Sequence, residues 1–333
     1  MSTAPSRKTD GYALLLLVVL LAVGIHVLLL GLLDIGERNS ERRNTAASTI
    51  AEARQALIGW SVTHGDLAAD KNPRPGNLPC PARDSDGNDD GNCATATGTG
   101  TGTLPWHSLA MVEPRDANSA KLVYTIMDPF RRANLKYAAT NSDTEGTAMI
   151  ISADGYPLAV RSRDLMATVE LRVLAEAKRA LAAYAAKHGG LYPNAAAPAD
   201  ATCLETVSDI HAHTLCPART GLCGGRLPED ALSPHAAQWF TENAWGRVLS
   251  YAVTAGKVAV AGADCPASIA VTGRHYDYVL VAPGTPLAGQ HRPSSAAADY
   301  VDDAITRTIW NPGPALDLAA PGATSNDHVQ GGP

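Results

Sequence analysis

The hydrophobic pattern of the chain is dominated by one unbroken apolar run near its start. From Tyr12 to Leu33 the only other ionisable side chain is that of His26. About 22 residues in a helix extend about 33 Å, which matches the hydrocarbon core of a bilayer. The run therefore predicts a transmembrane helix over residues 12–33.

Helical periodicity continues beyond this run, from Glu37 to Thr63. Apolar or small positions recur there at helical spacing: Ala47, Ile50, Arg54 by its aliphatic stem, Leu57 and Trp60. One helix from Tyr12 to about Thr63 would be about 78 Å long. The spacing predicts that its second half lays an apolar stripe on a globular head.

Three landmarks occur twice, in the same order, along the rest of the chain. The matching segments are Glu52–Leu67 with Glu176–Leu191, Asp128–Ala138 with Asn243–Ala252, and Ile150–Leu158 with Val279–Leu287. In this alignment Tyr137 corresponds to Tyr251. The recurrence indicates two copies of one unit. Each copy has an amphipathic helix, a Pro/Gly/Cys-rich loop and β-branched runs typical of strands.

The predicted fold class is α+β. A long N-terminal transmembrane helix continues into the first of two tandem units, each consisting of a helix packed on a small antiparallel sheet. The predicted organisation is a leader at 1–11, a transmembrane helix at 12–33, a first head unit at 34–160 that includes the helix continuation, a second head unit at 161–310 and a disordered tail at 311–333. The tail is predicted to be disordered because it is rich in Pro, Gly and Ala and has no periodicity.

Composition and cysteine content narrow the class of protein. The net charge is −6 and no basic stripe is present, so nucleic acid is not an expected partner. Six cysteines follow the apolar run, an even number that predicts disulfides in an oxidising compartment. They are Cys80, Cys93, Cys203, Cys216, Cys223 and Cys265. Fifteen pairings are open, and Cys80–Cys93 is the preferred one because it closes a Gly/Asp/Asn loop.

That Gly/Asp/Asn loop is the best candidate for a ligand site. Side-chain oxygens alternate at Asp84, Asp86, Asn88 and Asp90, which suits Ca²⁺. The spacing is not that of an EF-hand, and a solvated acidic turn is the alternative. His211, His213 and Cys216 are a weaker candidate for zinc, because their spacing matches no standard pattern.

Motifs for catalysis are absent from the sequence. It contains no GxSxG, HExxH or P-loop motif, and no lysine follows its Gly/Thr-rich run as in a phosphate-binding loop. No catalytic residue and no required cofactor is therefore predicted, and Ca²⁺ is the only expected ion.

The start of the chain resembles a prepilin of the type IV pilin family. A short basic leader with Arg7 and Lys8 ends at Gly11, and Tyr12 begins the apolar run. The segments Asn77–Cys93 and Gly102–Met111 are similar to a loop pattern of pilin-like proteins. The resemblance implies that prepilin peptidase cuts between Gly11 and Tyr12 and that the new amine is methylated.

Two positions depart from the family pattern. Tyr12 stands where Phe is usual, and Leu16 stands where the fifth mature residue is usually Glu. In the family, that Glu pairs with the N-terminal amine of a neighbouring subunit. Its absence implies a low-copy or tip subunit, similar to a minor pseudopilin of type II secretion, a group in which calcium sites occur.

The sequence therefore predicts a structural minor pilin or pseudopilin, not an enzyme. The resemblance implies a single-pass protein of the bacterial inner membrane, with its C-terminal part in the periplasm or in an extracellular filament. The expected partners are other pilin or pseudopilin subunits, prepilin peptidase and the lipid bilayer. Two alternatives stay open: an uncleaved, membrane-anchored periplasmic binding module or adhesin, and a periplasmic hydrolase whose site is assembled from distant residues.

Overall fold

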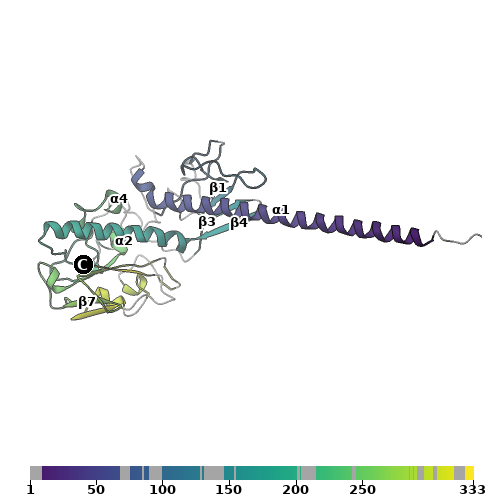
Figure 1. Ribbon diagram of the computed structural model, residues 1–333. Helices are drawn as coiled ribbons and strands as arrows, with labels where there is room; N and C mark the ends of the chain where they lie inside the picture. Colours follow the sequence, from purple (N-terminus) through teal and green to yellow (C-terminus); the bar gives the residue numbers. More distant parts are fainter. Residues whose placement is uncertain are drawn as a thin grey trace, which may run out of the picture.

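In the computed structural model, a long helix projects from a body that consists of β-sheets and further helices (Figure 1). The described residues are 10–333 except for 68–75, 85, 90–99, 128–129, 131–145, 154, 201–202, 204–214, 242–244, 285, 288, 291–295, 303–305 and 319–326. The predicted leader, residues 1–11, thus falls almost entirely outside this part of the chain.

The first helix, α1, runs without interruption from Asp10 to Leu67. Its second half packs on the body, and its first half extends away from it (Figure 1). The packed face is a stripe of buried residues at helical spacing: Ala46, Ile50, Ala53 and Leu57. The helix continues onto the body, as predicted, because this stripe is buried against it.

The predicted transmembrane helix over residues 12–33 is wrong. Within the described residues, no helix is long and apolar enough to cross a membrane. The predicted localisation as a single-pass protein of the bacterial inner membrane depended on this transmembrane helix and is therefore also wrong.

The first sheet is antiparallel and lies against the second half of α1. Its strands occur in the order β1 (Gly100–Thr103), β2 (Val123–Ile126), β3 (Thr147–Ala153) and β4 (Tyr156–Arg161). The face toward α1 is apolar, and Tyr124, Ile126, Met149 and Ile151 are fully buried. β4 is an edge strand and leads directly into the next helix.

The second helix, α2 (Ser162–Lys187), packs on a second antiparallel sheet. The strand order of this sheet is β5 (Gly224–Arg226), β6 (Ser250–Val253), β9 (Tyr278–Ala282) and β11 (His328–Gly332). The buried stripe of α2 includes Leu165, Val169, Val173, Ala177 and Leu181. Short helical segments connect the strands: α3 (Glu229–Leu232), α4 (Gln238–Thr241), α5 (Trp245–Val248), η4 (Ala255–Lys257), η5 (Ala297–Asp299) and η6 (Thr306–Trp310).

A third sheet corrects the predicted fold class further. It contains β7 (Ser268–Val271), β8 (Arg274–Tyr276) and β10 (Ala315–Leu318), and β10 pairs with β7 in parallel. The chain is therefore not a transmembrane helix followed by two single-sheet units, and strands rather than helices make up most of its elements.

The predicted disordered tail, residues 311–333, is also wrong, because it supplies β10 and β11. Leu316 and Leu318 alternate with exposed residues and are buried. This alternation extends over only four residues, so it does not stand out in a segment rich in Pro, Gly and Ala. It is nevertheless enough to bury one face of a short strand.

The first two sheets repeat the same local geometry. Gly102 pairs with Tyr124 across β1 and β2, and Gly225 pairs with Tyr251 across β5 and β6. A side chain at either glycine would collide with a backbone carbonyl oxygen, that of Ala82 at Gly102 and that of Ala196 at Gly225. Tyr124 thus takes the position equivalent to Tyr251, whereas the sequence alignment assigned Tyr137, which lies outside the described residues.

One arginine joins the two helices. Arg172 of α2 donates a hydrogen bond to the backbone oxygen of Val62 in α1. Its guanidinium carbon lies 4.1 Å from the centroid of the Trp239 ring in α4. The end of α1 is therefore tied to the second helix layer as well as to its own sheet.

Candidate interaction site

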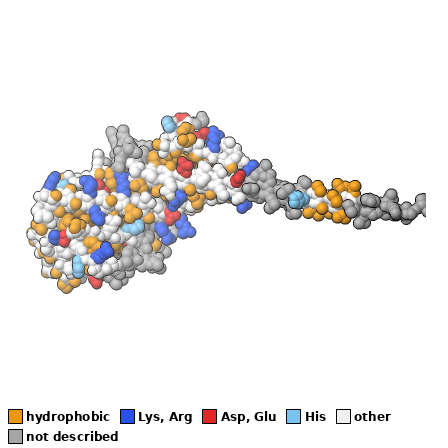
Figure 2. Space-filling view, in the orientation of Figure 1, with side chains coloured by type: hydrophobic (Ala, Val, Ile, Leu, Met, Phe, Trp, Pro, Cys, Tyr) orange, Lys and Arg blue, Asp and Glu red, His pale blue; other side chains and the backbone are white. Residues whose placement is uncertain are grey.

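The projecting part of α1 carries an exposed apolar surface, called here the apolar segment (residues 16–25). Its large side chains are all more than half exposed: Leu16, Leu17, Val18, Val19, Leu20, Leu21, Val23 and Ile25. They cluster on the projecting helix in Figure 2. A contiguous exposed apolar surface of this kind marks an interaction site rather than a free helix face.

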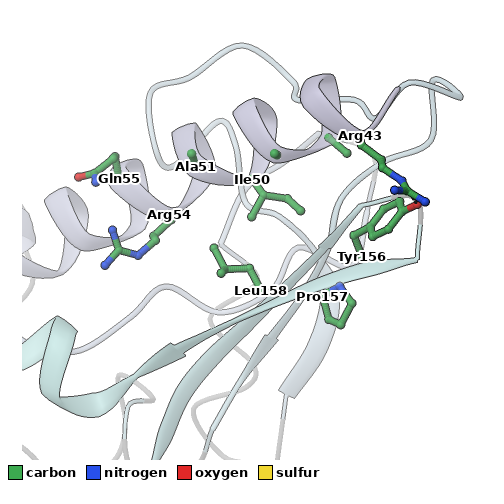
Figure 3. A pocket seen from close by; sticks show the side chains of 10 residues that line it. Arg43, Ile50, Ala51, Arg54, Gln55, Tyr156, Pro157 and Leu158 are labelled. Atoms are coloured by element: carbon green, nitrogen blue, oxygen red, sulfur yellow. Dashed lines mark hydrogen bonds between the residues drawn. The ribbon is translucent and has the colours of Figure 1, made fainter. Parts of the chain in front are cut away.

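A groove of about 350 Å³ lies where α1 passes over β4 (Figure 3). It is lined by Arg43, Ala46, Ala47, Ile50, Ala51, Arg54 and Gln55 of α1 and by Tyr156, Pro157 and Leu158 of β4. Ile50 and Leu158 approach one another across it, and the small side chains of Ala47 and Ala51 leave the helix surface open. The groove forms because β4 ends the sheet, so no further strand fills the space beneath α1.

Two cations mark the ends of the groove. The Nε atom of Arg43 donates a hydrogen bond of 3.2 Å to the hydroxyl oxygen of Tyr156, and its guanidinium lies 6.0 Å from the ring centroid. Arg54 extends along the groove from the next turns of the helix (Figure 3). Neither arginine pairs with a carboxylate within the described part of the chain. The groove is thus apolar in its floor and cationic at its ends.

In the Asp-rich loop, which is the predicted calcium site, the carboxylate oxygens of Asp86 accept hydrogen bonds from within the loop. Asn88 donates both its backbone N–H (2.9 Å) and its side-chain amide (2.7 Å) to Asp86. The hydrogen bond between the Asp84 and Asp86 carboxyls raises the pKa of Asp84, and together with the Asn88 donors it lowers the pKa of Asp86 to about 2. Asp90 lies outside the described residues.

Neighbouring contacts hold this loop against the turn after β1. Nδ1 of His107 lies 2.8 Å from Oδ1 of Asn88, and Oδ1 of Asp89 accepts a 3.1 Å hydrogen bond from the backbone N–H of Cys80. Gly87 has a positive φ of 71° and lies against the Trp106 ring. Within the described residues no three His, Cys, Asp or Glu side chains converge on a metal position. The calcium site stays a prediction.

Two disulfides are present, as expected for oxidised cysteines, and they settle two pairings that the sequence left open. Cys203 bonds to Cys216, and Cys223 bonds to Cys265. The pairing of Cys216 removes it from the zinc candidate, whose histidines, His211 and His213, lie outside the described residues. Cys80 is also disulfide-bonded, but Cys93 lies outside the described part, so the preferred Cys80–Cys93 pairing stays a prediction.

The predicted processing residues lie at the start of α1. Gly11 and Tyr12 follow Asp10, where the helix begins. They are far along the projecting helix from the groove, which begins at Arg43. Among the residues that the structure describes, none of the predicted site residues lines the groove.

A buried ion pair lies in the second unit. Oε2 of Glu229 accepts a 3.0 Å hydrogen bond from the backbone N–H of Cys216 and lies 3.5 Å from Nε of Arg247. Both side chains are buried. Burial raises the pKa of Glu229 to about 7, although Arg247 acts in the opposite direction. The guanidinium carbon of Arg226 lies 4.5 Å from the centroid of the Tyr300 ring and 4.8 Å from that of the Trp310 ring. The cluster lies in the core and offers no open surface.

Sequence reasoning missed the β4 side of the groove. The periodic positions Ala47, Ile50 and Arg54 were recognised as one helix stripe, but nothing local indicates that Tyr156 and Leu158 meet them. The sequence signal for β4 is the alternation of Tyr156, Leu158 and Val160 with other residues. That alternation is typical of a half-buried strand, but it does not indicate which helix crosses the strand.

No protein-family model, curated protein or solved structure matches this chain.

Proposed function

We propose that this protein is a structural subunit of a filament, of the minor pilin or pseudopilin kind, and that its role is assembly rather than catalysis. The observation that carries the proposal is the apolar segment on the projecting half of α1. Exposed apolar side chains such as Leu16 and Leu20 gain free energy when neighbouring subunits bury them. A rigid helix that holds them away from the body offers them to such neighbours.

The start of the chain supports the same role. Gly11 precedes Tyr12 at the beginning of α1, where prepilin peptidase would cut. The mature chain would then begin within the first turn of the helix, with the apolar segment only a few residues away. Leu16, in place of the family glutamate, favours a low-copy or tip position in a type IV pilus or a type II secretion-like filament.

The test is the intact mass of the protein purified from cells with and without a prepilin peptidase. We expect a chain that starts at N-methylated Tyr12 only when the peptidase is present. A Gly11→Val variant is the matched control and should keep residues 1–11 in both strains. A wild-type chain that keeps Met1–Gly11 in both strains would contradict the pilin pathway and leave a binding module as the leading interpretation.

A further inference from the structure

We propose that a second pocket, at the junction of the second and third sheets, binds a neutral saccharide. The pocket has a volume of about 330 Å³ and lies where β7 and β8 meet the ends of β6 and β11. Small-molecule sites have volumes of about 300–1,000 Å³, so this volume suits a small ligand. The lining side chains with hydrogen-bonding atoms are Thr254, Ser268, His275, Tyr276 and Asp277.

The hydroxyl of Thr254 is the observation that carries the proposal. Thr254 is only 8% exposed, yet its hydroxyl makes no hydrogen bond with any residue that the structure describes. Its backbone is held in place, because its N–H donates a 2.9 Å hydrogen bond to the backbone oxygen of Asp277. A buried hydroxyl without a partner is unfavourable, and a polar ligand in the pocket would supply that partner.

Three neighbouring side chains of the pocket also have uncommitted polar atoms. The hydroxyl of Ser268, the imidazole of His275 and the phenol of Tyr276 make no hydrogen bond within the described part of the chain. A hydroxyl or a neutral imidazole can both donate and accept. These residues belong to β7 and β8, which pair with one another, so their positions are fixed by a sheet and not by a loop.

Charge around the pocket favours a neutral ligand. Oδ2 of Asp277 lies 2.8 Å from Nζ of Lys257, so the carboxylate already has a cationic partner. Lys257 is not part of the pocket lining. An anionic ligand would therefore face the carboxylate without direct access to the ammonium group, and a cationic ligand would have to compete with Lys257.

A saccharide matches this set of groups better than other neutral ligands do. It has several adjacent hydroxyls that both donate and accept, as the uncommitted side chains require. The lining also contains Ile269 and the ring of Tyr276, which offer apolar surface to the C–H face of a sugar ring.

The pocket is remote from the surface proposed for assembly. β7 lies in the part of the body that is away from the projecting half of α1 (Figure 1). Subunits that bury the apolar segment would therefore leave the pocket open. Saccharide binding goes beyond the proposed structural role and does not depend on it.

Saturation-transfer NMR on the full-length protein tests this site. The probes are glucose, galactose, mannose, N-acetylglucosamine and lactose, with phosphorylated glucose as the anionic comparison. We expect at least one neutral sugar to bind. Thr254→Val keeps nearly the same shape without the hydroxyl and should raise Kd for that sugar roughly fivefold. Thr168→Val, the same change at an exposed position of α2 outside the pocket lining, should leave Kd unchanged.

Ser268→Ala gives a second reading and should weaken binding by a similar factor even if Thr254→Val proves too unstable to measure. The absence of binding by every neutral sugar, or binding that the measured pocket variants do not weaken, would overturn the saccharide site. Tighter binding of phosphorylated glucose than of glucose would also overturn it, because it would identify an anion site. The intact mass of the processed chain is independent of all these results, so failure of the saccharide site is distinguishable from failure of the filament role.

Discussion

The phenol of Tyr124 donates a hydrogen bond of 3.1 Å to the backbone oxygen of Pro79. Tyr251 makes the equivalent bond, of 3.0 Å, to Pro193. Both tyrosines are fully buried, and burial raises the pKa of each well above its ordinary value. In each unit a central strand is thus tied to the loop that follows the long helix.

Removal of either hydroxyl should destabilise the protein. We expect Tyr124→Phe and Tyr251→Phe each to lower the free energy of unfolding by about 1–2 kcal/mol, because a buried carbonyl loses its donor. Denaturant unfolding measures the difference. Tyr156→Phe, at an exposed position, is the control and should change stability by less than about 0.5 kcal/mol. Losses at Tyr124 and Tyr251 no larger than the loss at Tyr156 would contradict a stabilising role for the two buried hydrogen bonds.

The C-terminal strand should be held in place in a pH-dependent manner. Nδ1 of His328 in β11 lies 3.1 Å from Oε2 of Glu170 in α2, and this contact raises the pKa of His328. The folded state binds the proton more tightly than the unfolded chain. The resulting stability is complete below pH 6.5, the ordinary pKa of histidine, and is lost as pH rises through the higher folded-state value.

The measurement is the melting temperature as a function of pH for the wild type and for His328→Gln. The variant should lose the part of the decline that begins above pH 6.5 and should be less stable than the wild type mainly on the acidic side. Glu170→Gln should have the same effect, because the bond needs both partners. A wild-type profile that rises through this range would contradict the prediction.

The buried carboxyl of Glu229 should cost stability when it is removed. Glu229→Ala leaves Arg247 buried without its carboxylate and should lower the free energy of unfolding by about 3 kcal/mol. Glu52→Ala, on the exposed face of α1, is the control and should change little. A loss at Glu229 no larger than that at Glu52 would mean that the pair contributes nothing to the core.

The same carboxyl predicts a second pH effect. Its pKa is raised from 4.5 to about 7, so its contribution is fully present below pH 4.5 and declines as pH rises toward 7. Glu229→Gln keeps an acceptor for the Cys216 N–H but cannot ionise. Its stability should therefore be flatter than that of the wild type over this range in denaturant titrations at several pH values. An unchanged slope would contradict the raised pKa.

Two glycines should respond to alanine in opposite directions. Gly87 has a positive φ, and a side chain there would overlap the Trp106 ring, so Gly87→Ala should cost about 1–3 kcal/mol. Gly59 is an exposed helical residue with nothing within 4 Å of the added carbon. Gly59→Ala should stabilise α1 by up to about 1 kcal/mol. Thermal unfolding of both variants checks the difference, and a neutral Gly87→Ala would mean that the loop does not depend on this turn.

Local signals explain which parts of this structure were accessible from the sequence. The positions Ile50 and Leu57 follow the 3.6-residue period of a helix, and α1 does continue through them. Ala47, predicted for the same stripe, is exposed, and its neighbour Ala46 is buried instead. The prediction of a disordered tail was wrong because Leu316 and Leu318 belong to a strand of only four residues. So short a strand does not stand out in a segment rich in Pro, Gly and Ala. Hydropathy alone also failed at residues 12–33, since an apolar run does not distinguish a membrane span from a helix with other partners.

The sequence by itself determined that α1 is long, that its first half is apolar, and that the cysteines pair. These properties depend on neighbours within one or two helical turns and on residue chemistry. Only the tertiary structure decided that Tyr156 and Leu158 meet α1 and that Tyr124 takes a position equivalent to that of Tyr251. It also decided that the last strand joins the second sheet. Such contacts join residues far apart in the chain, and their choice depends on which buried faces fit together, which no local pattern encodes.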